Sequence, residues 1–198
     1  MEAQFPLNLV LFNLVNASES APDLVILIAK GFAVLTPWVL IVGFVWYWIF
    51  ETAEIRRSLM IAGITLGVGL IVNFTLSFLF YMPRPFELGV GTSFLTHSIE
   101  ASFPSDHATF VWSLGFGLAM TRPLRRLGQG IICLGLIVAW SRVYLGVHFP
   151  LDMLASFVIS FLSARFVKRL FGMLDQILFQ PIECINSRIF AAITRQKK

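Results

Sequence analysis

Two histidines stand in polar clusters whose composition suits phosphoryl transfer. His148 precedes Asp152 by four residues, and His107 ends the run Pro104-Ser105-Asp106-His107. If the helix carrying Asp152 reaches back to His148, the carboxylate can hold one ring nitrogen and leave the other free to attack. The second histidine can then protonate the leaving oxygen, so the pair divides nucleophilic and acid catalysis.

Two arginines and a serine accompany these histidines and suit a phosphate ligand. Arg84 lies between two prolines, and Arg142 precedes His148 by six residues. The planar guanidinium of arginine can hold two phosphate oxygens at once. Ser105 is predicted to cap the start of a helix, whose first amides have no carbonyl partner and therefore receive anions. Pro150 suits the first turn of the helix that follows His148, just as Ser105 suits the start of the earlier helix.

The elements that must carry these residues are membrane-spanning helices. The 198-residue chain is 57% hydrophobic and 13% charged, with a mean hydropathy of +0.81, and soluble domains rarely carry so little charge. We expect one all-α domain over residues 1–198, a polytopic membrane helix bundle with about five spans. The last three spans are short, so their ends must extend into the interface. The predicted spans are Leu24–Phe50, Leu59–Tyr81, His107–Met120, Gly128–Val143 and Leu151–Phe166.

Basic residues predict the orientation of the bundle. Of the 15 lysines and arginines, all but Lys30, Arg84 and Arg142 lie between spans one and two, between spans three and four, or after span five. In a five-span chain these positions share one side, which the positive-inside rule makes cytoplasmic. The histidine clusters then lie at the outer ends of the helices, where ionisable groups at membrane depth are functional by default. The residues on the cytoplasmic side are Arg56, Arg57, Arg122, Arg125, Arg126, Arg165, Lys168, Arg169, Arg188, Arg195, Lys197 and Lys198.

Both ends of the chain are predicted to lie along the membrane surface. The N-terminal segment 1–20 shows no cleavable signal peptide, and its apolar stretch is too short to cross a membrane. The transmembrane core is predicted over residues 24–168. The tail over 170–198 suits an amphipathic helix on the anionic inner leaflet, although a packed cytoplasmic hairpin is also open. The apolar stripes are Leu7, Val10, Leu11 and Leu14 at the start, then Leu170, Met173, Leu174, Ile177 and Leu178, then Ile182, Ile185, Ile189 and Ile193.

Small residues and cysteines are interpreted as packing residues. Gly63 and Gly67 are four apart in the second span, a spacing that lets helices approach closely. Cys133 and Cys184 form no pattern that would indicate a disulfide framework or a metal pair.

The polar clusters together resemble the three signatures of the type 2 phosphatidic acid phosphatase superfamily. The second signature, Pro-Ser-Gly-His, reads Pro104-Ser105-Asp106-His107, with Asp106 where glycine is usual. The first, Lys-x6-Arg-Pro, keeps Arg84-Pro85 but has Ser77 at the lysine position. These departures remove one positive charge from the expected phosphate pocket and add a negative one. The third signature, Ser-Arg-x5-His-x3-Asp, is complete in Ser141, Arg142, His148 and Asp152.

This resemblance implies a role for each matched residue. His148 is the expected nucleophile that forms a phosphohistidine, and Asp152 orients it. His107 is the expected acid for the leaving group and then the base for water. The family works without a metal, and no cofactor is expected. The residues expected to line the phosphate site are Arg84, Arg142, Ser105, Asp106 and Ser141.

A narrower resemblance suggests the substrate. Asn73, the run Pro83-Arg84-Pro85-Phe86 and residues 101–107 resemble the bacitracin-resistance branch of the family. Its members are undecaprenyl-diphosphate phosphatases, which recycle the carrier lipid for cell-wall (peptidoglycan) synthesis at the outer face of the bacterial plasma membrane. The partners implied are a prenyl or other lipid phosphate and the bilayer, and no nucleic acid.

Other interpretations stay open at this point. The substrate could be phosphatidic acid or phosphatidylglycerol phosphate, or the phosphate could pass to another lipid instead of water. His107, His148 and Asp152 could also ligate a metal. A transporter is a non-enzymatic alternative, but transporters place their polar groups near mid-membrane. In the outer loop, His97, Glu87 and Glu100 could contact substrate or a cation.

Overall fold

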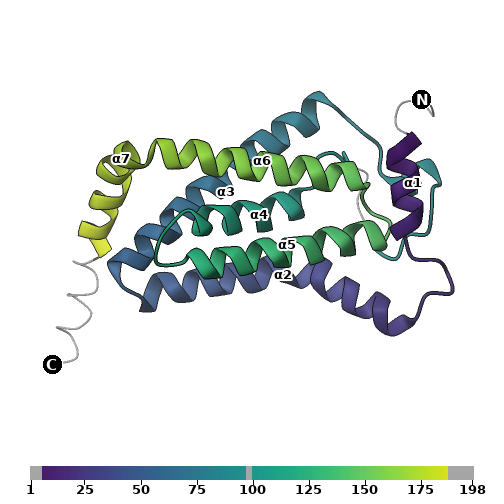
Figure 1. The fold of residues 1–198 in the computed structure, drawn as a ribbon, viewed down its shortest axis with the longest axis horizontal. Coiled ribbons are helices and arrows are strands. Elements are labelled where there is room, and N and C mark those ends of the chain that lie inside the picture. The colour runs from purple at the N-terminus through teal and green to yellow at the C-terminus, as the bar shows by residue number, and fades with distance from the viewer. Residues whose placement is uncertain (1–5, 97–99, 187–198) are drawn as a thin grey trace.

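A computed structural model describes residues 6–96 and 100–186, and every regular element in these ranges is helical. Helices α2 (Asp23–Phe50), α3 (Ala53–Leu79), α5 (Arg125–Tyr144) and α6 (Pro150–Arg169) are each long and apolar enough to span a membrane. These four, with the shorter α4 (Asp106–Ala119), run along the long axis of the molecule (Figure 1). The all-α membrane bundle predicted from the sequence is therefore confirmed.

The third predicted span is the shortest helix of the bundle and its centre. With 14 residues, α4 is about 21 Å long, less than the thickness of a hydrocarbon core. It packs against α3, α5 and α6, and most of its side chains are buried. Because its neighbours cover most of its surface, this short helix lies inside the bundle rather than on its outside.

Glycines let the helices approach α4 closely, but they are not the two that the sequence suggested. A side chain at Gly117 would collide with the backbone of α3, and one at Gly135 would collide with the indole of Trp112. By contrast, the space beside Gly67 is open, and Gly63 has only ordinary contact with Phe44. The prediction of close packing at Gly63 and Gly67 was wrong, because that face of α3 points away from α4.

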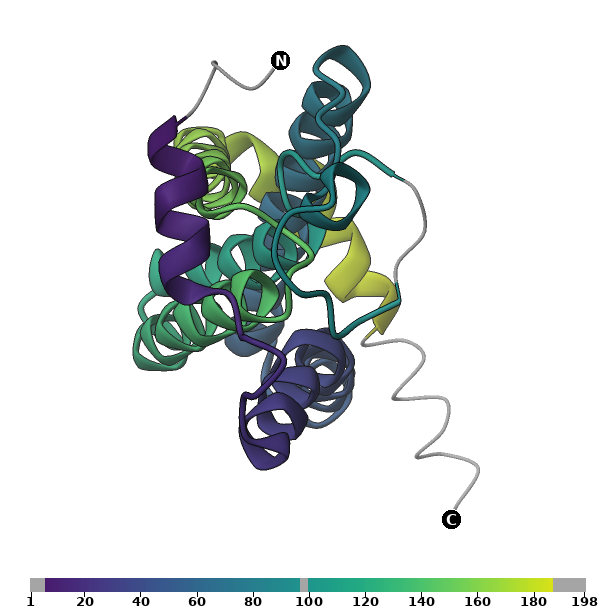
Figure 2. The same cartoon turned by 90° about the vertical axis from the view of Figure 1, so that its right-hand side faces the viewer.

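Helix α1 (Pro6–Val15) lies across one end of the bundle (Figures 1 and 2). Its apolar stripe stays exposed, with Leu7 at 69% and Leu14 at 77%, as expected for a helix on the membrane surface. Its opposite side is fastened to the protein, because Phe12 is fully buried against Phe149. Asn16 extends this attachment by hydrogen bonding the backbone of Thr92 and Tyr144.

Two glycines make this attachment possible. Gly91 and Gly146 both adopt positive φ, at 67° and 77°. A side chain at Gly91 would collide with Phe12 and Asn16, and one at Gly146 would collide with the carbonyl of Thr92. Helix α1 and the outer loops therefore form one packed layer over this end of the bundle.

The opposite end of the bundle gathers the basic residues. Helix α3 begins six residues earlier than predicted, so Arg56 and Arg57 lie in its first turns rather than in a loop. Helices α5 and α6 likewise take in the basic residues at their ends. The tail continues through α7 (Phe171–Leu174) and the π-helical η2 (Asp175–Phe179), and Ile189 and Ile193 lie outside the described residues. Met173 and Ile177 keep their side chains exposed, as the amphipathic prediction requires.

Candidate active site

His148 lies at the centre of a buried polar cluster beneath α1 and the outer loops. Its ring is fully buried, and its Nε2 atom faces three groups. Arg84 Nη1 lies 3.1 Å away, Arg142 Nη2 3.2 Å and Ser105 Oγ 3.3 Å. The four residues come from the segment before the 3-10 helix η1 (Pro85–Leu88), from the start of α4, from the end of α5 and from the α5–α6 loop. The structure thus brings together residues that the sequence separates by up to 64 positions.

The other ring nitrogen of His148 determines what Nε2 can do. Nδ1 lies 2.8 Å from the carbonyl oxygen of Ser102 and 3.3 Å from Asp152 Oδ2. A carbonyl oxygen only accepts, so Nδ1 must carry the proton in this arrangement. In the neutral ring Nε2 then keeps its lone pair and points it at the arginines and Ser105. This is the geometry of a nucleophile aimed at a bound anion.

Asp152 is held by the start of α6, in a way that differs from the expectation. Phe149 has extended backbone angles and Pro150 occupies the first helical turn, so the helix does not reach back to His148. The proline ring disfavours helical geometry at the residue before it, which explains why the helix stops there. Asp152 reaches the histidine as a capping residue instead, with Oδ2 accepting from the Phe149 amide at 2.8 Å and from Ser102 Oγ at 2.5 Å.

Arg84 is fixed by the backbone around it. Its guanidinium donates to the carbonyl oxygens of Glu100, Ala101 and Val147, and only 2% of the residue is exposed. Burial lowers its pKa from the usual value, against the opposing effect of carboxylates that include Asp106. The usual pKa of arginine lies far above neutrality, so Arg84 remains a cation at neutral pH. Its charge is therefore held in place before any substrate binds.

Ser105 caps α4 as predicted. Its Oγ accepts a long hydrogen bond of 3.5 Å from the Ala108 amide and also faces His148. Its carbonyl accepts from Ser156 Oγ of α6 at 2.9 Å, and one turn further Ser160 donates to the carbonyl of Thr109. These hydroxyl contacts hold α4 against α6 and so set the position of Ser105 relative to the histidine. The free amides of the first turn add a positive partial charge at the same place.

His107, in the first turn of α4, is more exposed than His148. Its side chain is 30% exposed and that of Asp106 is 43% exposed, in contrast to the buried His148. Asp106 Oδ1 accepts from the His107 amide at 2.8 Å and lies 3.0 Å from His107 Nδ1. The described contacts of Asp106 thus connect it to the histidine, which gives the unusual residue of the second motif a partner.

Two other motif positions point elsewhere. Ser141 is fully buried and donates to the carbonyl of Val138 in its own helix at 2.7 Å. Its hydroxyl proton is therefore not available to a phosphate oxygen. Ser77, at the usual lysine position, donates to the carbonyl of Phe103 at 3.0 Å.

Ser102 is a site residue to which sequence reasoning assigned no role. It is fully buried, its hydroxyl bonds Asp152 and its carbonyl bonds His148. Its position three residues before Ser105 was visible in the sequence. The contact to α6 was not, because it depends on how the loop before α4 folds over His148.

The other outer-loop candidates have no described hydrogen bond to His148, and Glu100 contacts the cluster only by accepting from Arg84 at its backbone carbonyl. His97 lies outside the described residues. Glu87 accepts from the Tyr81 hydroxyl and from the Arg84 amide, so its carboxylate caps the start of η1. Within residues 6–96 and 100–186, no three histidine, cysteine, aspartate or glutamate side chains are grouped to hold a metal.

Several known proteins are similar to this chain in sequence, and a solved structure is similar to it in fold. YbjG of Escherichia coli (strain K12), named provisionally as an undecaprenyl-diphosphatase, is 40% identical over 84% of this chain and 85% of its own length. The undecaprenyl-diphosphatase BcrC of Bacillus subtilis (strain 168) is 33% identical, covering 74% of this chain and 72% of its own. The crystal structure of Aquifex aeolicus LpxE superposes with a TM-score of 0.65 at 22% identity, over 84% of this chain and 97% of that chain. This last likeness shows a shared fold.

A family model assigns the chain directly. The PAP2 superfamily model matches residues 58–175, a range that contains every residue of the cluster around His148. Together with the relatives, this match confirms the prediction of a membrane lipid phosphatase. The chain belongs to the PAP2 superfamily.

Proposed function

We propose that this protein hydrolyses the terminal phosphate of undecaprenyl diphosphate, and that His148 is its nucleophile. The observation that carries the proposal is the setting of His148 Nε2, with its lone pair facing Arg84, Arg142 and Ser105 at 3.1 to 3.3 Å. A terminal phosphate placed there would have its charge neutralised by two buried guanidinium groups. The relatives named as undecaprenyl-diphosphatases support this choice of substrate.

The first half of the reaction forms a covalent intermediate. Nε2 attacks the terminal phosphorus, and the bond from that phosphorus to the bridging oxygen breaks. The electron pair of this bond stays on the bridging oxygen, which takes a proton from His107 and leaves as the lipid monophosphate. Ser102 and Asp152 hold the Nδ1 side of His148, where positive charge develops.

The second half regenerates the enzyme. His107, now neutral, takes a proton from a water molecule, and the oxygen attacks phosphohistidine. The phosphorus–nitrogen bond breaks, its electron pair returns to Nε2 and inorganic phosphate leaves. His107 is on the exposed side of the cluster, where both water and the leaving lipid can reach it. We assign Asp106 to orienting His107, because its Oδ1 lies against Nδ1 of that ring.

We further propose that the site faces the outside of a bacterial plasma membrane. The described basic residues of the predicted cytoplasmic set lie at the bundle end that is opposite to His148. By the positive-inside rule, this distribution supports a position of the histidine cluster on the outer face. An exposed His107 at that face suits a lipid diphosphate whose headgroup lies in the outer leaflet.

A panel of lipid phosphates tests the substrate. Purified protein in detergent with a chelator should release phosphate from an undecaprenyl or shorter prenyl diphosphate faster than from phosphatidic acid or phosphatidylglycerol phosphate. A preference for either phospholipid would contradict the proposed substrate and leave the class of reaction intact. Loss of activity in the chelator, restored by a divalent cation, would contradict the reaction written above.

A further inference from the structure

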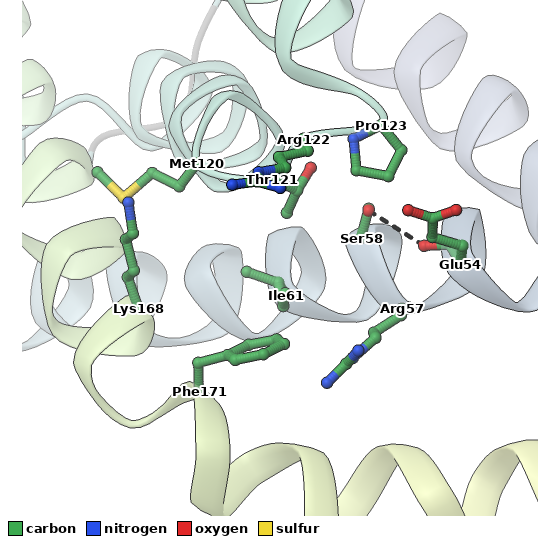
Figure 3. A pocket seen from close by; sticks show the side chains of 10 residues that line it. All are labelled: Glu54, Arg57, Ser58, Ile61, Met120, Thr121, Arg122, Pro123, Lys168 and Phe171. Atoms are coloured by element: carbon green, nitrogen blue, oxygen red, sulfur yellow. Dashed lines mark hydrogen bonds between the residues drawn. The ribbon is translucent and has the colours of Figure 1, made fainter.

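A basic cavity lies at the end of the bundle that is farthest from His148. Its volume is about 360 Å³, and it is bordered by the start of α3, the α4–α5 loop, the end of α6 and the start of α7. Figure 3 shows the side chains of Arg57, Arg122 and Lys168 around it, with Ile61 and Phe171 between Lys168 and Arg57. No step of the proposed reaction uses these residues.

The charges around the cavity do not balance. Three cations and one carboxylate, Glu54, line it. Arg57 has a partner, since its Nε lies 2.6 Å from Asp175 Oδ1 and its guanidinium lies over the Phe171 ring at 4.6 Å. Arg122 and Lys168 form no ion pair with any carboxylate in the described ranges. A surplus of positive charge therefore remains for an anionic ligand.

The cavity lies at the level of a membrane interface. It opens at the ends of the spanning helices α3 and α6, and the tail next to it exposes Met173 and Ile177 at 51% and 62%. An amphipathic segment with such a face inserts into the headgroup boundary of a bilayer. Ile61 and Phe171 add apolar walls beside the cations, which suit the glycerol and upper acyl chain of a lipid better than a free ion.

We propose that this cavity binds the phosphate headgroup of an anionic phospholipid from the leaflet opposite to the active site. Arg122 and Lys168 contact the phosphate, Arg57 borders it, and the apolar walls contact the glycerol backbone. Because Arg57 also holds Asp175, the lipid lies where the tail meets the bundle, and its binding stabilises that junction. Basic pockets between spanning helices are known to select such headgroups.

Lipid retention measures this site directly. Full-length protein in a neutral detergent is titrated with phosphatidylglycerol or phosphatidylcholine, and bound lipid is counted by native mass spectrometry. The test variant is R122Q/K168Q. The control is R125Q/R126Q, which removes the same charge from the same end outside the cavity lining. Unfolding temperatures without lipid must match before the variants are compared.

The expected results follow from about 1 kcal/mol for each basic side chain near an anionic lipid. Phosphatidylglycerol should bind in preference to phosphatidylcholine, and R122Q/K168Q should weaken its binding by about tenfold or more, against less than about threefold for the control pair. Equal losses in the two double variants would overturn the proposal, because they would indicate a general surface charge. Competition by inorganic phosphate at the same concentration as the lipid would also overturn it, in favour of a free-phosphate site.

Discussion

Both ends of the bundle contain clustered arginines, but the two ends differ in how deeply these side chains are buried. At the active-site end, Arg84 and Arg142 are each 2% exposed and face one histidine nitrogen. At the other end, Arg57 has 40% of its side chain exposed and borders an open cavity. Burial makes the first pair rigid and costly to rearrange, whereas the second group remains adaptable. The difference supports the proposals that one end carries out the chemistry and that the other binds a lipid beside the tail.

The largest effect should come from the proposed nucleophile. His148→Ala removes the imidazole that is proposed to attack phosphorus. We therefore expect turnover of a prenyl diphosphate to fall on the order of 10⁴-fold or more. Quenching of the unaltered enzyme during turnover with alkaline detergent should trap an acid-labile, base-stable phosphohistidine that the variant lacks. Substantial activity in a folded His148→Ala protein would remove it as the nucleophile.

The contrast between the ends is tested next by matched substitutions. Arg84→Lys and Arg142→Lys keep the charge but lose the planar fork, and each should lower kcat/KM by about 10²- to 10³-fold. Arg126→Lys makes the same change at the opposite end and should alter kcat/KM by less than about twofold. Similar losses at both ends would mean that net charge matters and local geometry does not.

A smaller effect is expected at Asp106. Asp106→Asn keeps the size of the side chain but removes the charge beside His107, so kcat should fall by up to about 10²-fold. An alkyl phosphate monoester should lose much more activity than p-nitrophenyl phosphate, because its alkoxide leaving group needs a proton and p-nitrophenolate does not. Equal losses on both substrates would show that Asp106 acts on folding or on phosphate binding instead of on His107.

The smallest effect is expected where the tail is attached. Glu183 receives two hydrogen bonds from Arg56, which lower the pKa of its carboxyl group. A lowered pKa stabilises the fold above the unfolded value, so this contribution is present at neutral pH and lost as acid protonates Glu183. Glu183→Gln should cost less than about 1 kcal/mol at pH 7, because the pair is partly exposed. Thermal unfolding at neutral and acidic pH should show the two proteins converging in acid.

Much of the fold was readable from local sequence. Each predicted span matches a helix, with starts and ends that agree within six residues. Ser105 caps α4 and Pro150 starts α6 as expected, because both features depend on a few adjacent residues. Local signals of this kind need no knowledge of neighbouring helices.

Other features required the packed molecule. The sequence placed Gly63 and Gly67 at a helix contact, but the contact with α4 involves Gly117 and Gly135. Spacing shows only that small residues share a face. Which face meets another helix depends on the rotation of each helix about its axis, and tertiary packing decides that.

The sequence by itself selected the candidate chemical set and predicted its side of the membrane. Motif spacing selected His148, Asp152 and the arginines, and the distribution of basic residues predicted the orientation. Only the tertiary structure decided which atom faces which: that Nε2 of His148 lies near the donors, that the Ser102 carbonyl lies near Nδ1 and that Asp106 lies against His107. Such contacts join segments up to 64 residues apart, so they depend on loop paths and helix rotation that no local pattern encodes.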